Sequence, residues 1–93
     1  MTHQLKQLAA RRAKIIRGQA DGLLNLIEQD RYCMDILVQS LAMQRALGAL
    51  NKLLVENHLK SHVAERVKKA GALDRQTINE FMKLYDLDNI RGK

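Results

Sequence analysis

The sequence has no proline and no tryptophan, and its aromatic residues are two tyrosines and one phenylalanine. Without proline, and with few β-branched residues, the chain is expected to be all-helical, because both residue types disfavour helices. Aliphatic side chains and the four methionines must then supply the core. We expect one small all-α domain over residues 1–93, whose modest core makes oligomerisation a source of stability.

The chain also lacks the features that mark several other classes of protein. Its single cysteine, Cys33, cannot form an intrachain disulfide, which suits a reducing cytoplasm. No apolar run reaches the length of a membrane span, and the N-terminus has no signal-peptide core. There is no acid–base pair, phosphate-binding glycine loop or nucleophile motif. We therefore expect a cytoplasmic protein that is not an enzyme and has no membrane partner.

The net charge of +6 predicts a polyanionic partner, with nucleic acid as the first candidate and an acidic membrane surface as the second. The first twenty residues contain no acidic residue. Their basic residues are Lys6, Arg11, Arg12, Lys14 and Arg17. This bias fits either an ordinary solvated helix face or a face that binds phosphates.

Helical spacing of apolar residues predicts three helices. They cover about 4–28, 30–69 and 75–87. Asp30 is the expected N-cap of the second helix and Asp74 that of the third, because a short carboxylate can accept from free backbone N–H groups. Gly71 fits the residue just past the end of the long second helix.

The long central helix carries a possible metal site. His58 and His62 lie four residues apart, so their rings can converge on one ion. Cys33 lies 25 residues before His58 on the same helix face, but about 37 Å away along the axis. An antiparallel helix from a second copy, crossing near Ala46, would place Cys33 beside both histidines and create two equal sites per dimer. By residue type alone, His3 is a possible fourth ligand.

One thiolate with two or three imidazoles is a borderline-soft donor set. It suits nickel, cobalt, zinc or copper(II), and copper(I) fits in trigonal geometry. The alternatives are that Cys33 is a core residue and the two histidines are surface residues. A thiol of Cys33 activated by His58 of another copy is a further possibility.

The chain resembles a known family, the copper-sensitive operon repressor and nickel/cobalt repressor family (CsoR/RcnR-like) of all-helical metal sensors. The similarity covers most of the chain. It rests on Ile16-Arg17-Gly18-Gln19, Tyr32-Cys33, Leu37, Gln39, Ala42, Ala46-Leu47, Leu53-Leu54, His58-Leu59 and His62.

The resemblance implies an antiparallel four-helix-bundle dimer with the third helix packed across it, and dimers paired into a homotetramer. It implies a repressor that binds operator DNA when metal-free and leaves it when metal binds. The implied metal ligands are His3, Cys33, His58 and His62. Tyr32 and Glu80 are implied to be residues that do not bind the metal themselves but couple the metal-bound histidine to the third helix. The candidate DNA-binding residues are Arg11, Arg12, Lys14, Arg17 and Gln19.

Copper sensors of this family typically carry cysteine where this chain has His62. The donor set therefore resembles the nickel/cobalt branch, and nickel or cobalt is the preferred effector, with copper or zinc also possible. The alternatives are a copper(I)-responsive repressor of the same family, or a thiol- or aldehyde-responsive or metal-buffering protein without a DNA role.

Overall fold

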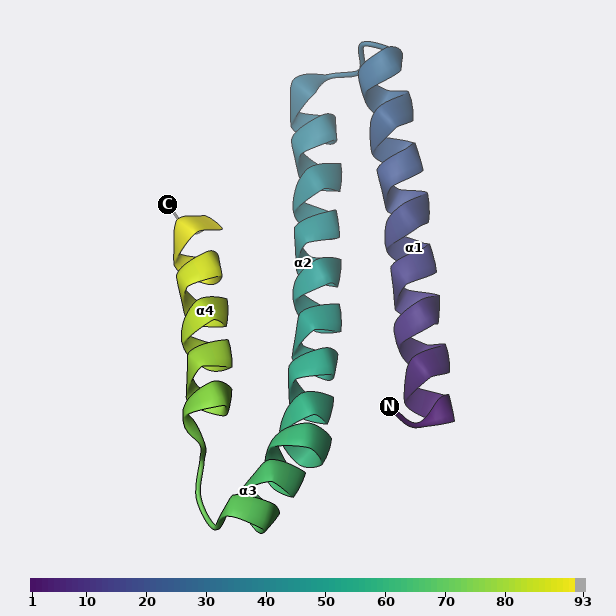
Figure 1. Cartoon of the computed structure of the whole chain (residues 1–93). Coiled ribbons are helices and arrows are strands. Elements are labelled where there is room, and N and C mark those ends of the chain that lie inside the picture. The colour runs from purple at the N-terminus through teal and green to yellow at the C-terminus, as the bar shows by residue number, and fades with distance from the viewer. Residues whose placement is uncertain (92–93) are drawn as a thin grey trace. The chain divides into compact units, whose positions relative to one another are not determined.

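The structure of the chain is a computed structural model that describes residues 1–91, which form helices joined by short turns and contain no strand. This confirms the predicted all-α class. The chain divides into two compact units, one of residues 1–57 and one that begins at His58. The elements are α1 (His3–Glu28), α2 (Cys33–His58), the π-helical turn η1 (Leu59–Val63), α3 (Ala64–Ala70) and α4 (Arg75–Arg91) (Figure 1). None of the described helices is both long and apolar enough to span a bilayer.

In the first unit, α1 begins where Thr2 Oγ1 accepts a hydrogen bond from the backbone N–H of Leu5, at 3.1 Å. The helix ends in a turn in which Asp30 has a positive φ of 51°. The prediction that Asp30 caps the second helix is therefore wrong. Asp30 belongs to the turn, since a short polar residue tolerates the left-handed conformation. The first turn of α2 instead starts at the Tyr32 carbonyl, which accepts from Asp35 and Ile36.

α1 and α2 form an antiparallel hairpin (Figure 1). The Gln39 side-chain Nε2 donates to the Gln19 backbone oxygen at 3.1 Å, and Arg12 Nη1 donates to the Ala49 oxygen at 3.5 Å. Residues nearer the N-terminus of α1 therefore contact residues nearer the C-terminus of α2, as in any antiparallel pair of helices. The helices approach closely near Gly22, where a Cβ atom would lie 3.3 Å from Gln39 Nε2.

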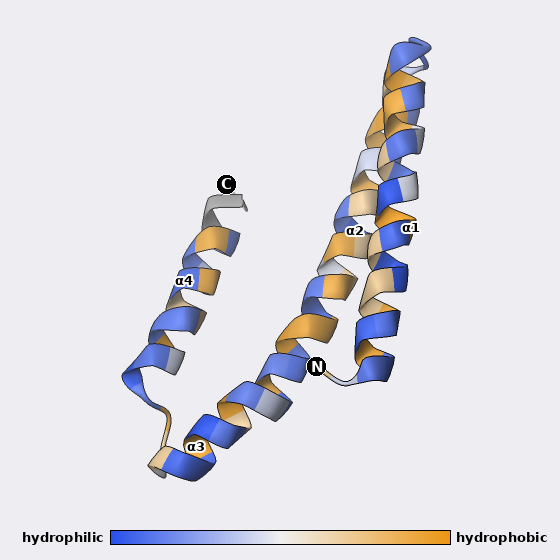
Figure 2. Cartoon of the chain, turned by 45° about the vertical axis from the view of Figure 1, so that its right-hand side comes forward, coloured by the Kyte–Doolittle hydropathy of each residue, from blue (hydrophilic) through white to orange (hydrophobic). Residues whose placement is uncertain are grey.

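The hairpin leaves much of its apolar surface open, and neither α1 nor α2 has a fully buried residue. Figure 2 shows hydrophobic residues distributed along both helices, between hydrophilic ones. One exposed apolar stripe on α2 has the i, i+3, i+4, i+7 spacing of a single helix face. We call it the α2 stripe, and it consists of Met34, Leu37, Val38 and Leu41, with Val38 64% exposed.

In the second unit, the helical chain passes through η1 before it continues as α3. The prediction of one helix over 30–69 is thus right about the length of the helical run and wrong about its continuity. A π-helical turn accommodates more residues per turn than an α-helix, and such turns occur often at functional sites. The run ends at Gly71, which has a φ of 79° and whose N–H donates to the Val67 oxygen at 2.7 Å. This confirms Gly71 as the residue just past the end.

α4 begins as predicted, because Asp74 Oδ1 accepts from the backbone N–H of Thr77 at 2.8 Å. The helix runs to Arg91, four residues past the predicted end at Leu87. The two buried residues of the described chain, Val63 and Thr77, both belong to this second unit. Its η1 turn and the first turns of α4 therefore contain the best-protected side chains.

The hairpin geometry predicts different effects of alanine at two glycines of α1. A Cβ at Gly18 would meet no heavy atom of the described chain within 4 Å, whereas one at Gly22 would press on Gln39. We expect Gly18→Ala to raise the free energy of unfolding by about 1 kcal/mol through helix propensity, and Gly22→Ala to raise it by less. Urea unfolding followed by circular dichroism, at one protein concentration, measures both. Equal gains would contradict close packing at Gly22.

Candidate functional site

His58 and His62 come together at the junction of α2 and η1. Their ring centroids lie 5.3 Å apart with the planes tilted by 40°, and the His58 ring also lies 6.1 Å from that of Phe81 on α4. Two imidazoles bound to one ion through bonds of about 2.0–2.1 Å have ring centres roughly 5–6 Å apart. The observed spacing therefore fits two ligands of a single metal ion.

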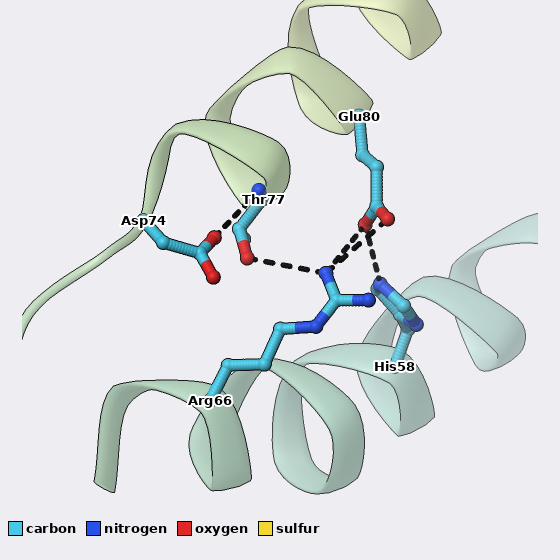
Figure 3. A network of polar contacts seen from close by, with 5 residues as sticks. All are labelled: His58, Arg66, Asp74, Thr77 and Glu80. Atoms are coloured by element: carbon cyan, nitrogen blue, oxygen red, sulfur yellow. Dashed lines mark hydrogen bonds and ion pairs between the residues drawn. The ribbon is translucent and has the colours of Figure 1, made fainter. Parts of the chain in front are cut away.

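The position of Glu80 determines which nitrogen of His58 is available. His58 Nε2 lies 3.3 Å from Glu80 Oε2 (Figure 3). An ionised carboxylate only accepts hydrogen bonds, so this contact requires the hydrogen on Nε2. The neutral ring then keeps its lone pair on Nδ1, which is the usual arrangement of a histidine ligand oriented by a carboxylate.

Glu80 is in turn held by Arg66 from α3. Arg66 Nη1 lies 3.2 Å from both carboxylate oxygens of Glu80 and 3.3 Å from Thr77 Oγ1 (Figure 3). Thr77 belongs to the first turn of α4, where Asp74 accepts its backbone N–H. The polar network therefore runs from His58 through Glu80 and Arg66 to the capped end of α4.

The network also shifts two carboxyl groups toward their ionised forms. The hydrogen bond from Arg66 is the main reason that the pKa of Glu80 lies below its ordinary value; partial desolvation opposes it and the bond with His58 assists it. Hydrogen bonds from Thr77 lower the pKa of Asp74 in the same way. Both groups therefore stay ionised at a lower pH than the same carboxyl groups would without these hydrogen bonds.

A single chain does not assemble the full predicted ligand set. Cys33 is the first residue of α2 and His58 the last, so the helix itself holds them about 37 Å apart. Cys33 is exposed, and His3 is exposed at the first position of α1. Among the described residues, no three histidine, cysteine or acidic side chains gather in one place. A site with thiolate and imidazole ligands therefore needs a second copy of the chain.

Glu80 contacts His58, whereas Tyr32 is 71% exposed beside Cys33. That either residue supports a metal ligand stays a prediction. Its position next to Cys33 means that Tyr32 would reach a His58 site together with that cysteine, from the second copy.

The candidate DNA-binding residues of α1 fall on two sides of the helix. Arg11, Lys14 and Arg17 recur every three residues and are exposed. Arg12 and Gln19 lie seven residues apart on the side of α2, where both are half-buried. Within the described chain, the Gln19 Oε1 atom is buried and has no hydrogen-bond donor. The exposed trio is the better surface for phosphates, and Arg12 and Gln19 are placed to pack between helices.

Sequence reasoning missed Arg66, Thr77 and the π-helical turn. One signal was present, because Asp74, Thr77 and Glu80 recur at three-residue spacing and so follow one side of a helix. Nothing in that pattern identifies Arg66, which lies 14 residues from Glu80. Neither helix propensity nor the spacing of apolar residues predicts the turn η1.

Comparison with known proteins finds similar proteins over most of the chain. A family described as metal-sensitive transcriptional repressors matches residues 5–86. The copper-sensing transcriptional repressor CsoR of Bacillus subtilis is 38% identical over 80 residues, which are 86% of this chain and 77% of that protein. The protein of the same name from Mycobacterium ulcerans is 38% identical over 64 residues, 66% of this chain and 55% of its own length.

A solved structure shows the same fold. The copper-sensing repressor CsoR with Cu(I) from Geobacillus thermodenitrificans aligns with a TM-score of 0.78 at 30% identity. The alignment covers 100% of this chain and 92% of the other. The fold similarity therefore extends through α4 and is not confined to the α1–α2 hairpin.

The lowered pKa of Glu80 predicts how stability changes in acid. A carboxyl group with a lowered pKa stabilises the folded chain above its ordinary pKa, and this contribution is lost as the pH falls through the lowered value. We expect Glu80→Gln to flatten the dependence of the melting temperature on pH as the pH falls below 4.5, the ordinary pKa of a glutamate side chain. Asp86→Asn, which neutralises an exposed carboxylate of α4, is the control. A native-like slope in Glu80→Gln would contradict the network.

Proposed function

Because the chain belongs to the family of metal-sensitive transcriptional repressors, we propose that it binds operator DNA when metal-free and leaves that DNA when a transition metal binds. Members of this family regulate transcription and are not enzymes, in line with the absence of a catalytic motif. Such a repressor acts in the cytoplasm, where bacterial DNA is found.

The paired rings of His58 and His62 are the observation that carries this proposal. Their 5.3 Å spacing fits one ion, and Glu80 leaves Nδ1 of His58 free for it. Cys33 of a second copy supplies the thiolate, and His3 is a further candidate ligand. Because the Cys33 thiol must lose its proton to bind as a thiolate, metal affinity falls at low pH.

The proposed assembly is a homodimer in which α1 and α2 of two copies form an antiparallel four-helix bundle, with α4 packed across it. The α2 stripe supports this, because an exposed apolar face of four side chains is stabilised when another helix covers it. An antiparallel pairing of two α2 helices also brings Cys33 of one copy toward His58 of the other. Pairing of dimers into a homotetramer completes the proposal.

The link between metal and DNA runs through the ring of His58. Its Nδ1 is the candidate metal donor, and its Nε2 holds Glu80 on α4. A metal ion that moves the ring through Nδ1 therefore also moves Nε2 and changes its contact with Glu80. By thermodynamic linkage, metal that weakens DNA binding must itself be bound more weakly by the DNA complex, by the same factor.

We propose copper(I) as the effector. The named relatives and the solved structure are copper-sensing repressors, which favours copper over the nickel or cobalt preferred on sequence grounds. A thiolate with two imidazoles can bind copper(I) in trigonal geometry. Nickel or cobalt is the second candidate, favoured by the imidazole of His62 and by the possible ligand His3, because nitrogen donors suit these ions.

Titration with metal tests the proposal. We expect metal-free protein to bind DNA that it has selected from a random pool, and copper(I) to weaken that binding at least about tenfold. Cys33→Ser should bind the same DNA within about twofold and lose the response. Fluorescence anisotropy of labelled DNA measures both. Release by nickel or cobalt but not copper would establish the second candidate, and no DNA binding by metal-free protein would leave only a metal-buffering or thiol-responsive role.

The exposed basic residues of α1 predict the salt dependence of DNA binding. Each phosphate contact contributes about one unit to the slope of log affinity against log salt concentration. We expect Lys14→Ala and Arg17→Ala each to reduce this slope by about 1 and to weaken binding at low salt. Lys83→Ala, on α4, makes the same change in net charge and should leave the slope unchanged. Equal effects of all three variants would point to net charge alone.

A further inference from the structure

Arg66 occupies the centre of the polar network in the second unit. One nitrogen of its guanidinium, Nη1, meets both oxygens of Glu80 at 3.2 Å and Thr77 Oγ1 at 3.3 Å (Figure 3). Thr77 is only 2% exposed and is the most deeply buried residue that the structure describes. Asp74 accepts its backbone N–H at 2.8 Å. Arg66 therefore connects the Glu80 carboxylate to the most deeply buried residue of α4.

Glu80 needs such an anchor to hold its position. Its side chain is 39% exposed and has several rotatable bonds, and His58 offers it a single hydrogen at 3.3 Å. A lone contact of that length to a partly exposed group restrains a flexible side chain weakly. With Arg66 beside both oxygens, the carboxylate is restrained so that Oε2 remains on His58 Nε2.

We propose that Arg66 is a positioning residue for the metal response, which acts on His58 through Glu80. Arg66 and Thr77 fix the carboxylate, the carboxylate orients the ring, and the ring presents Nδ1 as the ligand atom. The effect of Arg66 on metal-induced release of DNA rests on the proposed function. Its effect on the orientation of the His58 ring does not rest on that function, because it concerns contacts within the metal-free chain.

The positioning is tested on full-length protein without metal or DNA. Long-range nitrogen–proton NMR reads the ring nitrogens of His58, and Glu80→Gln defines how they shift when the carboxylate contact is lost. We expect Arg66→Gln to shift them in the same direction, and the double variant with Glu80→Gln to shift no further than Glu80→Gln alone. Arg75→Gln, at an exposed arginine of α4, should leave them unchanged.

Two results would overturn the proposal. One is an unchanged His58 ring in Arg66→Gln. The other is a double variant whose shift is the sum of both single shifts, because a residue acting through Glu80 has no effect once Glu80 is altered. If Arg66→Gln does not fold, Arg66→Lys replaces it. Lysine keeps the charge but lacks the planar group, so a partial shift is expected and none would again overturn the proposal.

The consequence for the response is measured with copper(I) and labelled DNA. We expect Arg66→Gln to reduce the copper-induced loss of DNA affinity by about fivefold or more, while copper affinity without DNA changes by less than about threefold. If copper affinity without DNA falls by as much as the copper-induced change in DNA affinity, Arg66 supports copper binding only and not its coupling to DNA. If native protein does not release DNA, the proposed function fails, whereas the NMR comparison still decides the role of Arg66.

Discussion

The exposure of apolar side chains is the constraint on which the rest of this structure depends. In the described chain, Val63 is the buried apolar residue, while α1 and α2 have no buried residue and about half of their large aliphatic side chains are exposed. Burying one such side chain fully contributes about 1.5–3 kcal/mol. A two-helix hairpin cannot obtain this from its own contacts, and the same surface that would stabilise a dimer also carries Cys33 at its edge. Stability and completion of the proposed metal site would then depend on the same association.

In the second unit several side chains hydrogen-bond to one another, whereas the two hydrogen bonds described across the hairpin each join a side chain to a backbone oxygen. In the proposed site His58 has two roles, since Glu80 holds one ring nitrogen and the other is the proposed metal donor. Thr77 and Asp74 fix the beginning of α4, and Arg66 joins that end to Glu80. If His58 binds the metal as proposed, this arrangement links the ligand atom to the position of α4, which is what a metal-responsive repressor requires.

The ligand atoms of the proposed site and the proteins similar to this chain favour different metal ions. The imidazole of His62 suits nickel and cobalt, whereas the relatives that match this chain are copper-sensing repressors. The geometry of the two rings is compatible with either, because bond lengths to nitrogen differ little among these ions. The choice therefore depends on the ligands that a second copy supplies and on the coordination number they create.

By itself, the sequence determined what depends on short spacing along the chain. The absence of proline and the apolar periodicity predicted the helical class, Asp74 and Gly71 were identified as helix boundaries, and the four-residue spacing paired His58 with His62. These features depend on neighbours within one or two turns. The tertiary structure decided what depends on distant residues: the placement of Glu80 on His58, 22 residues away, and of Arg66 on Glu80. It also decided that Asp30 lies in a turn and that a π-helical turn interrupts the long helix. Helix propensity and apolar spacing do not determine these local changes in backbone conformation.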